Sequence, residues 1–588
     1  ENRPVAGRMN TSIYYDGDCP FCSDYVGFTR LREAAGQVDL VDLRADARAR
    51  DRFLAQGADP DRGMIVETGG QVYHGADAMH VLSLMSSGQG WRNAAAAALF
   101  RHRMLSRALY PMLRMGRNAV VTAMGAAPLA ARDAAHEAQY LIFARFLGLF
   151  ATLHVFYYLF RGAPGDVQPT APVLFALGLG LIVVPGARAL FIGLIAALAL
   201  DGWLHAPTHS NHTMLLNFFV VTVIAAGGWH AWRGSPWDRF FADIRPVGRC
   251  LLLIMYTFGI FHKINTGFLN PEVSCAVVLW REMPAPLVWI DTAPMHYLAI
   301  YGTFAVEAVI MAMLILPRFR HWGICAGIGF HGLLALSGYA MYPVFSTLAI
   351  VLHTLFISPA SAQAVTQSAR WQGLDRALRS LPGAGLLLTG LAGIAFFAMQ
   401  RDYTQVALIW MALVAWPLIL LATKGAADPE SDRTGAQFAA PLMVLNVIPV
   451  LFFLNAVSPY LGLKNAQSMN MFANLRLEGG VSNHLVLPGA PGPFAYLSDV
   501  VEVTGIDGQP LIVRGYEDVR MGLVFSDFMA LARRLDPATE VSFLRNGTAM
   551  GPMSAAEVLA TQTGPQVPGW ASRFVHFHPV ILDRPRPC

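Results

Sequence analysis

Charged side chains are scarce in this chain, and their scarcity decides the class of protein. Only 14% of the 588 residues are Asp, Glu, Lys or Arg, whereas 54% are hydrophobic. A soluble globular domain carries about 25% charged residues. The composition therefore excludes an ordinary soluble protein and predicts one that lies in a lipid bilayer.

Cysteine and an excess of one charge are also lacking. Six cysteines are too few for a disulfide framework, and only Cys19 and Cys22 stand close together. The net charge is +4, and the arginines occur in short clusters between apolar runs rather than in a basic aromatic stripe. This pattern suits membrane orientation, so we expect a bilayer and no nucleic acid as partner.

The amino-terminal region has a more ordinary composition. Residues 10–90 predict a small soluble α/β unit, with strands at "SIYYDGDC" and "VDLVDL" and a hairpin that turns at Gly69-Gly70. Helices are expected from Cys22 to Arg32 and at "ADAMHVLSLMS". Residues 91–136 are rich in arginine and predict a basic amphipathic linker along an anionic membrane surface.

The carboxyl-terminal region, residues 460–588, predicts a soluble β-rich domain. Its signals are a hairpin that turns at Asp507-Gly508, a helix at "FSDFMALARRL", and strands at "EVSFL" and "RFVHFHPVIL". The first part of this region, residues 460–488, has two interpretations. It either caps a membrane cavity or is the loop-rich start of the domain.

Long apolar runs fill residues 137–459 and predict a polytopic, mainly α-helical bundle. Each run is near the length that a bilayer demands. We expect about eleven spans, near 140–160, 171–184, 188–204, 213–231, 249–264, 297–316, 322–340, 344–357, 383–399, 404–422 and 438–457.

The charges between the runs predict an orientation. Basic residues recur on one side, at Arg188, Arg233, Arg239, Arg245, Arg249, Arg318, Arg320, Arg370, Arg376, Arg379 and Lys424. The positive-inside rule makes that side cytoplasmic, together with the basic linker. We therefore expect a multi-pass protein of the inner membrane, with the amino-terminal unit in the cytoplasm and the carboxyl-terminal domain in the periplasm or outside the cell.

The motif "DGDCPFC" places Cys19 and Cys22 at a helix start, where the dipole lowers the pKa of the first thiol. We expect Cys19 to be the more reactive and the more exposed thiol. With "VYHGADA", the motif resembles the DCC-motif family of thiol-disulfide oxidoreductases over residues 11–90. The resemblance implies a thioredoxin-like fold and a redox role. Where thioredoxins have a cis-proline, this chain has Arg62-Gly63-Met64, and the alternative is a structural or metal-prone pair.

Several polar groups lie at membrane depth, where a charge costs roughly 2.5–3.5 kcal/mol on insertion scales. Groups this costly normally face a cavity and one another, although a lysine can instead snorkel to the interface. They are Lys263 and His262 in "FGIFHKINTGF", Asn211 and His212 in "HSNHTMLLNFF", Glu307, and His331.

The order and spacing of these patterns over residues 140–360 resemble the vitamin K-dependent gamma-carboxylase family and its bacterial relatives with a horizontally transferred transmembrane domain. The resemblance implies that Lys263 is the base that deprotonates a hydroquinone. It implies that Asn211 and His212 stabilise anions and that His331 is a further active-site histidine. A lysine acts as a base only as the neutral amine, and we expect burial beside neutral imidazoles to favour that form.

The same resemblance implies a reduced quinone as cofactor, with oxygen and carbon dioxide as co-substrates and a protein or peptide substrate on the outer side. A rival is an iron site, because His205, His209 and His212 lie at i, i+4 and i+7. Pro207 interrupts that helix and no carboxylate lies within the cluster, so we expect no metal.

Three hypotheses result from the sequence. The first is a quinol-dependent membrane enzyme of the gamma-carboxylase type. The second is a membrane thiol-disulfide oxidoreductase whose helical domain binds quinone. The third is a non-enzymatic subunit that binds a quinone or lipid within a larger complex.

Overall fold

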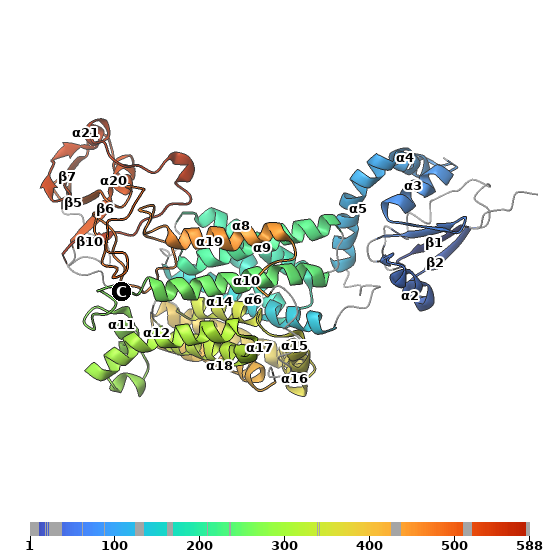
Figure 1. Cartoon of the computed structure of the whole chain (residues 1–588), viewed down its shortest axis with the longest axis horizontal. Coiled ribbons are helices and arrows are strands. Elements are labelled where there is room, and N and C mark those ends of the chain that lie inside the picture. The colour runs from blue at the N-terminus through green and yellow to red at the C-terminus, as the bar shows by residue number, and fades with distance from the viewer. Residues whose placement is uncertain are drawn as a thin grey trace, which may run out of the picture.

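The computed structural model describes residues 11–17, 19, 22, 38–60, 63–87, 89–123, 134–161, 169–207, 210–233, 237–337, 339, 342–424, 437–509 and 520–583. The chain is mainly helical, with a small sheet in each terminal region. Figure 1 shows these two regions at opposite ends of a helical bundle.

The amino-terminal sheet has the strand order β2-β1-β3-β4. Its strands are β1 (Thr11–Tyr15), β2 (Val38–Asp42), β3 (Ile65–Thr68) and β4 (Gln71–His74). Strand β1 pairs with β2 in parallel and with β3 antiparallel. The predicted strands and the hairpin at Gly69-Gly70 are confirmed, and both glycines have the positive φ that a tight turn requires. Most of the predicted helix after Cys22 lies outside the described residues.

Helices cover this sheet and connect it to the bundle. They are α2 (Ala47–Ala55), α3 (Ala76–Met85), α4 (Trp91–Phe100) and α5 (Arg103–Ala123). Helix α5 packs against α3 on one side and against α8 and α9 of the bundle on the other. Figure 1 shows it running across the end of the bundle, between the sheet and the membrane helices.

The apolar region folds into the bundle. Its helices are α6 (Ala134–Arg161), α7 (Ala171–Val183), α8 (Arg188–His205), α9 (Asn211–Arg233), α10 (Trp237–Phe261), α11 (Cys275–Arg281), α12 (Ala293–Ile315), α13 (Arg320–Leu336), α14 (Tyr342–Thr354), α15 (Pro359–Thr366), α16 (Ala369–Arg379), α17 (Leu381–Met399), α18 (Tyr403–Lys424) and α19 (Val447–Val457). Serine side chains cap the amino termini of α15, α16 and α17, which satisfies backbone donors at these short connections.

The span count differs from the prediction. Within the described residues, six helices are long and apolar enough to cross a membrane: α6, α8, α9, α10, α12 and α17. The bent pair α14 and α15 makes a seventh if it is one span. The prediction of about eleven spans is therefore not confirmed. Runs such as α7, with 13 residues, form helices shorter than the ~20 residues that a bilayer requires.

Helix α6 lies at the centre of the bundle, since 94% of the residues in its apolar 18-residue stretch are buried. It packs closely on α7, where Gly148 faces Gly178. A Cβ atom at Gly148 would lie 2.6 Å from the carbonyl oxygen of Gly178, so this crossing requires glycine.

The carboxyl-terminal sheet joins β10-β6-β5-β7-β8, and β9 pairs with β7. Its elements are β5 (Val500–Ile506), β6 (Met521–Val524), α20 (Phe525–Ala532), β7 (Glu540–Arg545), β8 (Thr548–Ala549), β9 (Met553–Ser554), α21 (Ala555–Thr561) and β10 (Val580–Ile581). The predicted helix and the strand at "EVSFL" are confirmed. The strand expected at "RFVHFHPVIL" is reduced to β10, since Pro579 has no N–H for a sheet ladder.

A segment without regular structure, residues 460–488, lies on the end of the bundle far from α5. The Nδ2 of Asn265, just beyond α10, donates to the carbonyl oxygen of Ala473 at 2.6 Å. The backbone N–H of Leu485 donates to the carbonyl of Ile264 at 2.9 Å. These bonds attach the carboxyl-terminal region to the bundle.

Candidate functional site

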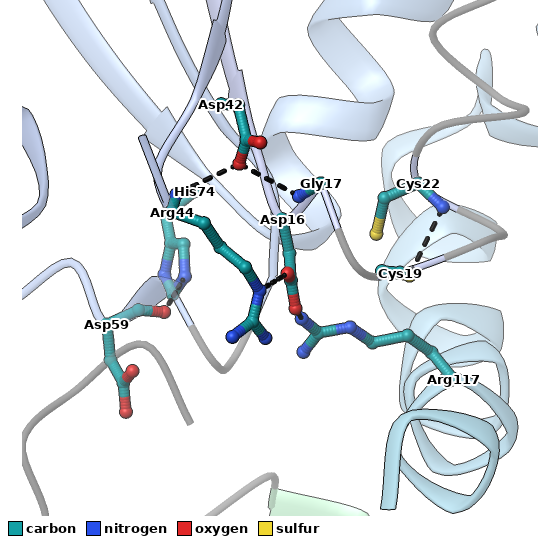
Figure 2. A network of polar contacts seen from close by, with 9 residues as sticks. All are labelled: Asp16, Gly17, Cys19, Cys22, Asp42, Arg44, Asp59, His74 and Arg117. Carbon is teal, nitrogen blue, oxygen red and sulfur yellow. Dashed lines mark hydrogen bonds and ion pairs between the residues drawn. The ribbon is translucent and has the colours of Figure 1, made fainter. Parts of the chain in front are cut away.

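The first candidate site lies where β1 ends. The chain turns after Tyr15, and the N–H of Cys19 donates to the carbonyl oxygen of Asp16 at 3.1 Å. The N–H of Cys22 donates to the Sγ of Cys19 at 3.2 Å. Figure 2 shows this bond and the neighbouring turn, in which Gly17 donates to Asp42 at 3.0 Å. The motif thus aims the backbone N–H of Cys22 at the first sulfur.

Two arginines meet at the buried carboxylate of Asp16, which is 3% exposed. The Nε of Arg44, just after β2, lies 2.6 Å from Oδ1. The Nη2 of Arg117, on α5, lies 2.7 Å from Oδ2. In Figure 2 the side chain of Arg117 reaches from its helix toward Asp16 and Cys19. A residue about one hundred positions away thus joins the cysteine motif.

These contacts make Cys19 the nucleophilic thiol. The hydrogen bond from the Cys22 side chain lowers the pKa of Cys19 to about 6, and a bond and positive charge from Arg117 add to this effect. The same hydrogen bond and burial raise the pKa of Cys22 above its ordinary value. Since only a thiolate attacks a disulfide, these pKa shifts suit Cys19 to attack and Cys22 to resolve.

The exposure of the two cysteines is the reverse of the prediction. Cys19 is 0% exposed, whereas Cys22 is half-buried. The expectation that Cys19 is the more exposed thiol was therefore wrong. The low pKa comes from hydrogen bonds and a cation in a buried place, and exposure is not its cause.

The structure explains why a glycine, Gly63, stands where thioredoxins have a cis-proline. Gly63 precedes β3, and a Cβ atom there would collide with the hydroxyl of Tyr110 on α5. Burial raises the pKa of Tyr110 to about 12, so this phenol stays neutral. Glycine therefore provides the space in which α5 packs against the thiol site.

The second candidate site is a cavity of about 250 Å³ inside the membrane part. Separate helices supply its polar wall: Asn211 from α9, Tyr256 from α10, Glu307 from α12 and His331 from α13, with Lys263 after α10. Met469, Met471 and Phe472 of the 460–488 segment also line it. The interpretation of this segment as a cap on the cavity is thereby supported.

Lys263 and Glu307 form a buried ion pair. The Nζ of Lys263 lies 2.6 Å from Oε1 of Glu307, and both side chains are 9% exposed. The sequence predicted that Glu307 and Lys263 face the same cavity, and a neutral Lys263 was expected from the neighbouring imidazoles only, whereas the structure adds this carboxylate. A lysine that snorkels to the interface would also be exposed, so this geometry argues against that alternative as well.

Tyr256 connects two buried histidines. Its hydroxyl lies 3.0 Å from Nε2 of His331 and 3.2 Å from Nε2 of His353. Nδ1 of His353 lies 2.7 Å from the carbonyl oxygen of Ala349, so this nitrogen carries the proton and Nε2 of His353 is an acceptor. Tyr256 therefore donates to His353 and accepts from His331, which leaves Nδ1 of His331 as an acceptor.

Three buried acceptors of the cavity residues have no hydrogen-bond partner among the described parts of the protein. They are Oδ1 of Asn211, Oε2 of Glu307 and Nδ1 of His331. Buried polar atoms are normally satisfied, so unsatisfied ones indicate an unseen partner. A partner for these atoms must be a hydrogen-bond donor.

The other predicted histidines lie outside the cavity wall. His262 is buried, with Nδ1 at 2.8 Å from the hydroxyl of Tyr460 and Nε2 at 2.9 Å from the carbonyl oxygen of Ser468. These bonds hold the 460–488 segment. Nδ1 of His212 bonds Ser210 at 2.9 Å, and its ring packs edge-on against His154. The structure thus brings Asn211, Lys263, Glu307 and His331 together, and gives His262 a structural place.

The described residues contain no group of three or more His, Cys, Asp or Glu that could hold a metal ion. His209 lies outside the described residues. Asp201, a buried carboxylate on α8 that lies 3.5 Å from His154, is not among the residues predicted from the sequence. Arg117, Tyr256 and His353 are not among them either. The costly position of Asp201 inside a span was a signal that could have revealed it.

A C-x-x-C thiolate held in an α/β unit defines a thiol–disulfide oxidoreductase domain. Residues 13–123 match the family described as DCC1-like thiol-disulfide oxidoreductase. The chain therefore carries an amino-terminal DCC1-like domain, and this domain includes α4 and α5. Comparison with curated proteins and with solved structures gives no match. The gamma-carboxylase resemblance of the membrane part gains no support from these comparisons.

Proposed function

We propose that this chain is a multi-pass membrane protein whose amino-terminal domain performs thiol–disulfide exchange through Cys19 and Cys22. The observation that carries the proposal is the hydrogen-bonded Cys19 thiolate, whose pKa of about 6 makes it ionised at neutral pH. The parallel β1–β2 pair and the β3–β4 hairpin also fit a thioredoxin-like fold.

The exchange proceeds in two displacements. The Cys19 thiolate attacks one sulfur of a substrate disulfide, forms a mixed disulfide and releases the other sulfur as a thiolate. Cys22 then loses its proton to that leaving thiolate and attacks the Sγ of Cys19, which breaks the mixed disulfide and releases the second substrate sulfur as a thiolate that takes a proton from water. The products are a Cys19–Cys22 disulfide and a substrate dithiol, and the reverse steps oxidise a dithiol.

The test uses the reduced full-length protein and a small aromatic disulfide whose released thiol is coloured. Cys19→Ser should abolish exchange, whereas Cys22→Ser should stop at a mixed disulfide that mass spectrometry detects. Cys325→Ser, on α13, is the matched control and should exchange like the parent protein. Unchanged exchange by Cys19→Ser would refute the proposal.

We propose as a second function that the membrane cavity binds a reduced quinone. The specific observation is the set of three unsatisfied acceptors, which suits the two hydroxyl donors of a quinol better than a quinone, which only accepts. The volume of about 250 Å³ suffices for a ring, since a cavity of about 150 Å³ holds benzene. Leu298 and Leu333 on its wall are 61% and 43% exposed, which favours entry from the bilayer.

The Lys263–Glu307 pair would then take the proton of a quinol hydroxyl. Oε2 of Glu307 is an open acceptor, and Nζ of Lys263 keeps a positive charge beside the anion that forms. Either member of the pair can hold the proton. The reaction that follows, with oxygen and carbon dioxide as co-substrates, stays a prediction of the sequence resemblance.

Two substitutions of Lys263 test whether Lys263 or Glu307 takes the proton of the quinol. Lys263→Ala should abolish oxygen uptake with a short-chain quinol while leaving quinol binding largely intact, because proton transfer and ring burial are different interactions. Lys263→Arg should be inactive if lysine is the base, since guanidinium stays protonated. An active Lys263→Arg protein would assign the proton to Glu307. Binding without any turnover in the parent protein would instead favour an accessory subunit.

We propose that the amino-terminal domain faces the cytoplasm and the carboxyl-terminal domain faces outward. Cys275, near the outer domain, is disulfide-bonded, whereas Cys19 and Cys22 are free. Disulfides persist in oxidising compartments, which supports this orientation. An impermeant thiol reagent applied to intact cells should label Phe574→Cys and leave Asp51→Cys unlabelled. The opposite pattern would reverse the orientation.

A further inference from the structure

Helix α5 makes two contacts one helical turn apart. The guanidinium of Arg114 donates to the carbonyl oxygen of Ala231 at 3.2 Å, and also to that of Trp232, at the carboxyl end of α9. Three residues later, the buried Arg117 bonds Asp16 beside Cys19. The same helix therefore touches the membrane bundle and the thiol site.

We propose that α5 completes the thiol site, with Arg117 as the cation that stabilises the Cys19 thiolate while Arg114 holds the helix on α9. This inference rests on the thiol–disulfide function proposed above. It assigns a role to a helix that the sequence presents as a linker, and it makes the reactivity of Cys19 depend on contact with the membrane bundle.

The physical reason is the cost of a buried anion. Cys19 is 0% exposed, and a charge in such a place requires an opposite charge or several donors. Cys22 supplies neutral donors only. Arg117 both bonds Cys19 and adds a positive charge beside it. Its hydrogen bond to Asp16 at 2.7 Å fixes the guanidinium in place.

Arg44 provides a matched comparison. It also bonds Asp16, at 2.6 Å, but on the other carboxylate oxygen and from the end of β2. Removing either arginine leaves Asp16 with one cation. The loss of Arg117 also removes a hydrogen bond and a positive charge that act on Cys19 directly.

The experiment measures the pH at which half of Cys19 is thiolate, without any disulfide substrate. The ultraviolet absorbance of the thiolate is taken as the difference between the full-length protein and its Cys19→Ser variant. The midpoint of the parent protein should lie near pH 6. Arg117→Gln should raise it by about 1 pH unit or more, as expected for the loss of an adjacent opposite charge. Arg117→Lys should lie between the two, and Arg44→Gln should shift clearly less.

An Arg117→Gln protein with an unshifted midpoint, or an equal shift in Arg44→Gln, would overturn the role of Arg117. If Arg117→Gln does not fold, the role of Arg117 is tested by comparing the midpoint shifts of Arg117→Lys and Arg44→Gln. An unshifted midpoint in Arg117→Lys, or an equal shift in the two variants, would then overturn that role. Because no substrate is present, a protein that shows the shift but no exchange would refute the proposed function and leave this inference intact.

A separate variant tests whether the thiolate midpoint of Cys19 depends on the contact between α5 and the bundle. Arg114→Gln removes the bonds to α9 and leaves every described contact of Cys19 in place. We expect its midpoint to rise in the same direction as that of Arg117→Gln and by a smaller amount. A midpoint equal to that of the parent protein would show that the contact with α9 does not act on the thiol.

Discussion

The thiol site and the membrane cavity each bury charged groups, but they satisfy them differently. At the thiol site, Asp16 has two arginine partners and Cys19 receives hydrogen bonds from Cys22 and Arg117. In the cavity, the described residues give Lys263 one carboxylate partner, Glu307, and leave three acceptors open. A site whose anions already have cations and donors is prepared for its own chemistry, whereas a site with open acceptors has room for a ligand that brings donors.

The two sites also differ in how their residues come together. Cys19 and Cys22 are three residues apart, so a local motif reveals them. In the cavity, Asn211, Lys263, Glu307 and His331 come from separate parts of the chain, and each is recognisable only because a polar group inside a span is costly. Because the two sites are built differently, we expect single substitutions to affect stability and binding differently at each site.

The largest effect should come from breaking the ion pair in the cavity. Glu307→Ala leaves the ammonium of Lys263 buried without its carboxylate, which typically costs about 3–5 kcal/mol. Thermal unfolding in detergent should show this loss. The double variant Lys263→Met with Glu307→Leu should be much closer to the parent protein, because no charge is left unpaired. Equal stability of the single variant and the parent would mean that the pair is solvated.

A second buried lysine sharpens the comparison, because no carboxylate among the described residues pairs with it. Lys464 in the carboxyl-terminal region is 3% exposed, and its Nζ donates to the carbonyl oxygen of Phe574 at 3.2 Å. Burial lowers the pKa of Lys464 from 10.5 to about 8. The unfolded chain therefore binds more protons between pH 8 and pH 10.5, and stability should rise with pH in this range.

The expected size of this effect is about 2–3 kcal/mol between pH 7 and pH 10, from the difference between the two pKa values. It should appear as the difference in unfolding free energy between the parent protein and Lys464→Met, measured at several pH values. A difference that stays constant over this range would show that Lys464 keeps its proton when folded.

A smaller effect is expected at Tyr256, whose hydroxyl joins His331 to His353. Tyr256→Phe leaves two buried imidazole nitrogens without a partner, which should cost about 1–3 kcal/mol of stability. It should also weaken quinol binding, because His331 can then adopt either tautomer. Phe345→Leu is the control for the stability measurement, since it changes a cavity-lining ring beside His331 without removing a hydrogen bond. Unaltered quinol affinity in Tyr256→Phe would remove Tyr256 from the site.

The sequence predicts much of both candidate sites, and there are physical reasons why the other residues could not be predicted from it. Lys263, Glu307 and His331 were found because charge and imidazole are costly at membrane depth. Tyr256 was not, since a tyrosine in a membrane helix is neither rare nor costly. Arg117 stands among other arginines in a stretch that reads as a surface helix, and only the fold brings it to Cys19. Short apolar runs such as α7 look like spans because hydropathy does not report helix length.

The last prediction concerns pH at the thiol site, where no residue is changed. With a pKa of about 6, Cys19 is mostly thiolate above pH 7 and mostly thiol below pH 5. The initial rate of exchange should therefore fall about fivefold from pH 6 to pH 5 and should be nearly constant above pH 7. An ordinary thiol of pKa 9.0 would instead gain rate up to pH 9. Stopped-flow measurement of thiol release distinguishes the two profiles. A rate that continues to rise between pH 7 and pH 9 would mean that the surroundings of Cys19 do not stabilise its thiolate.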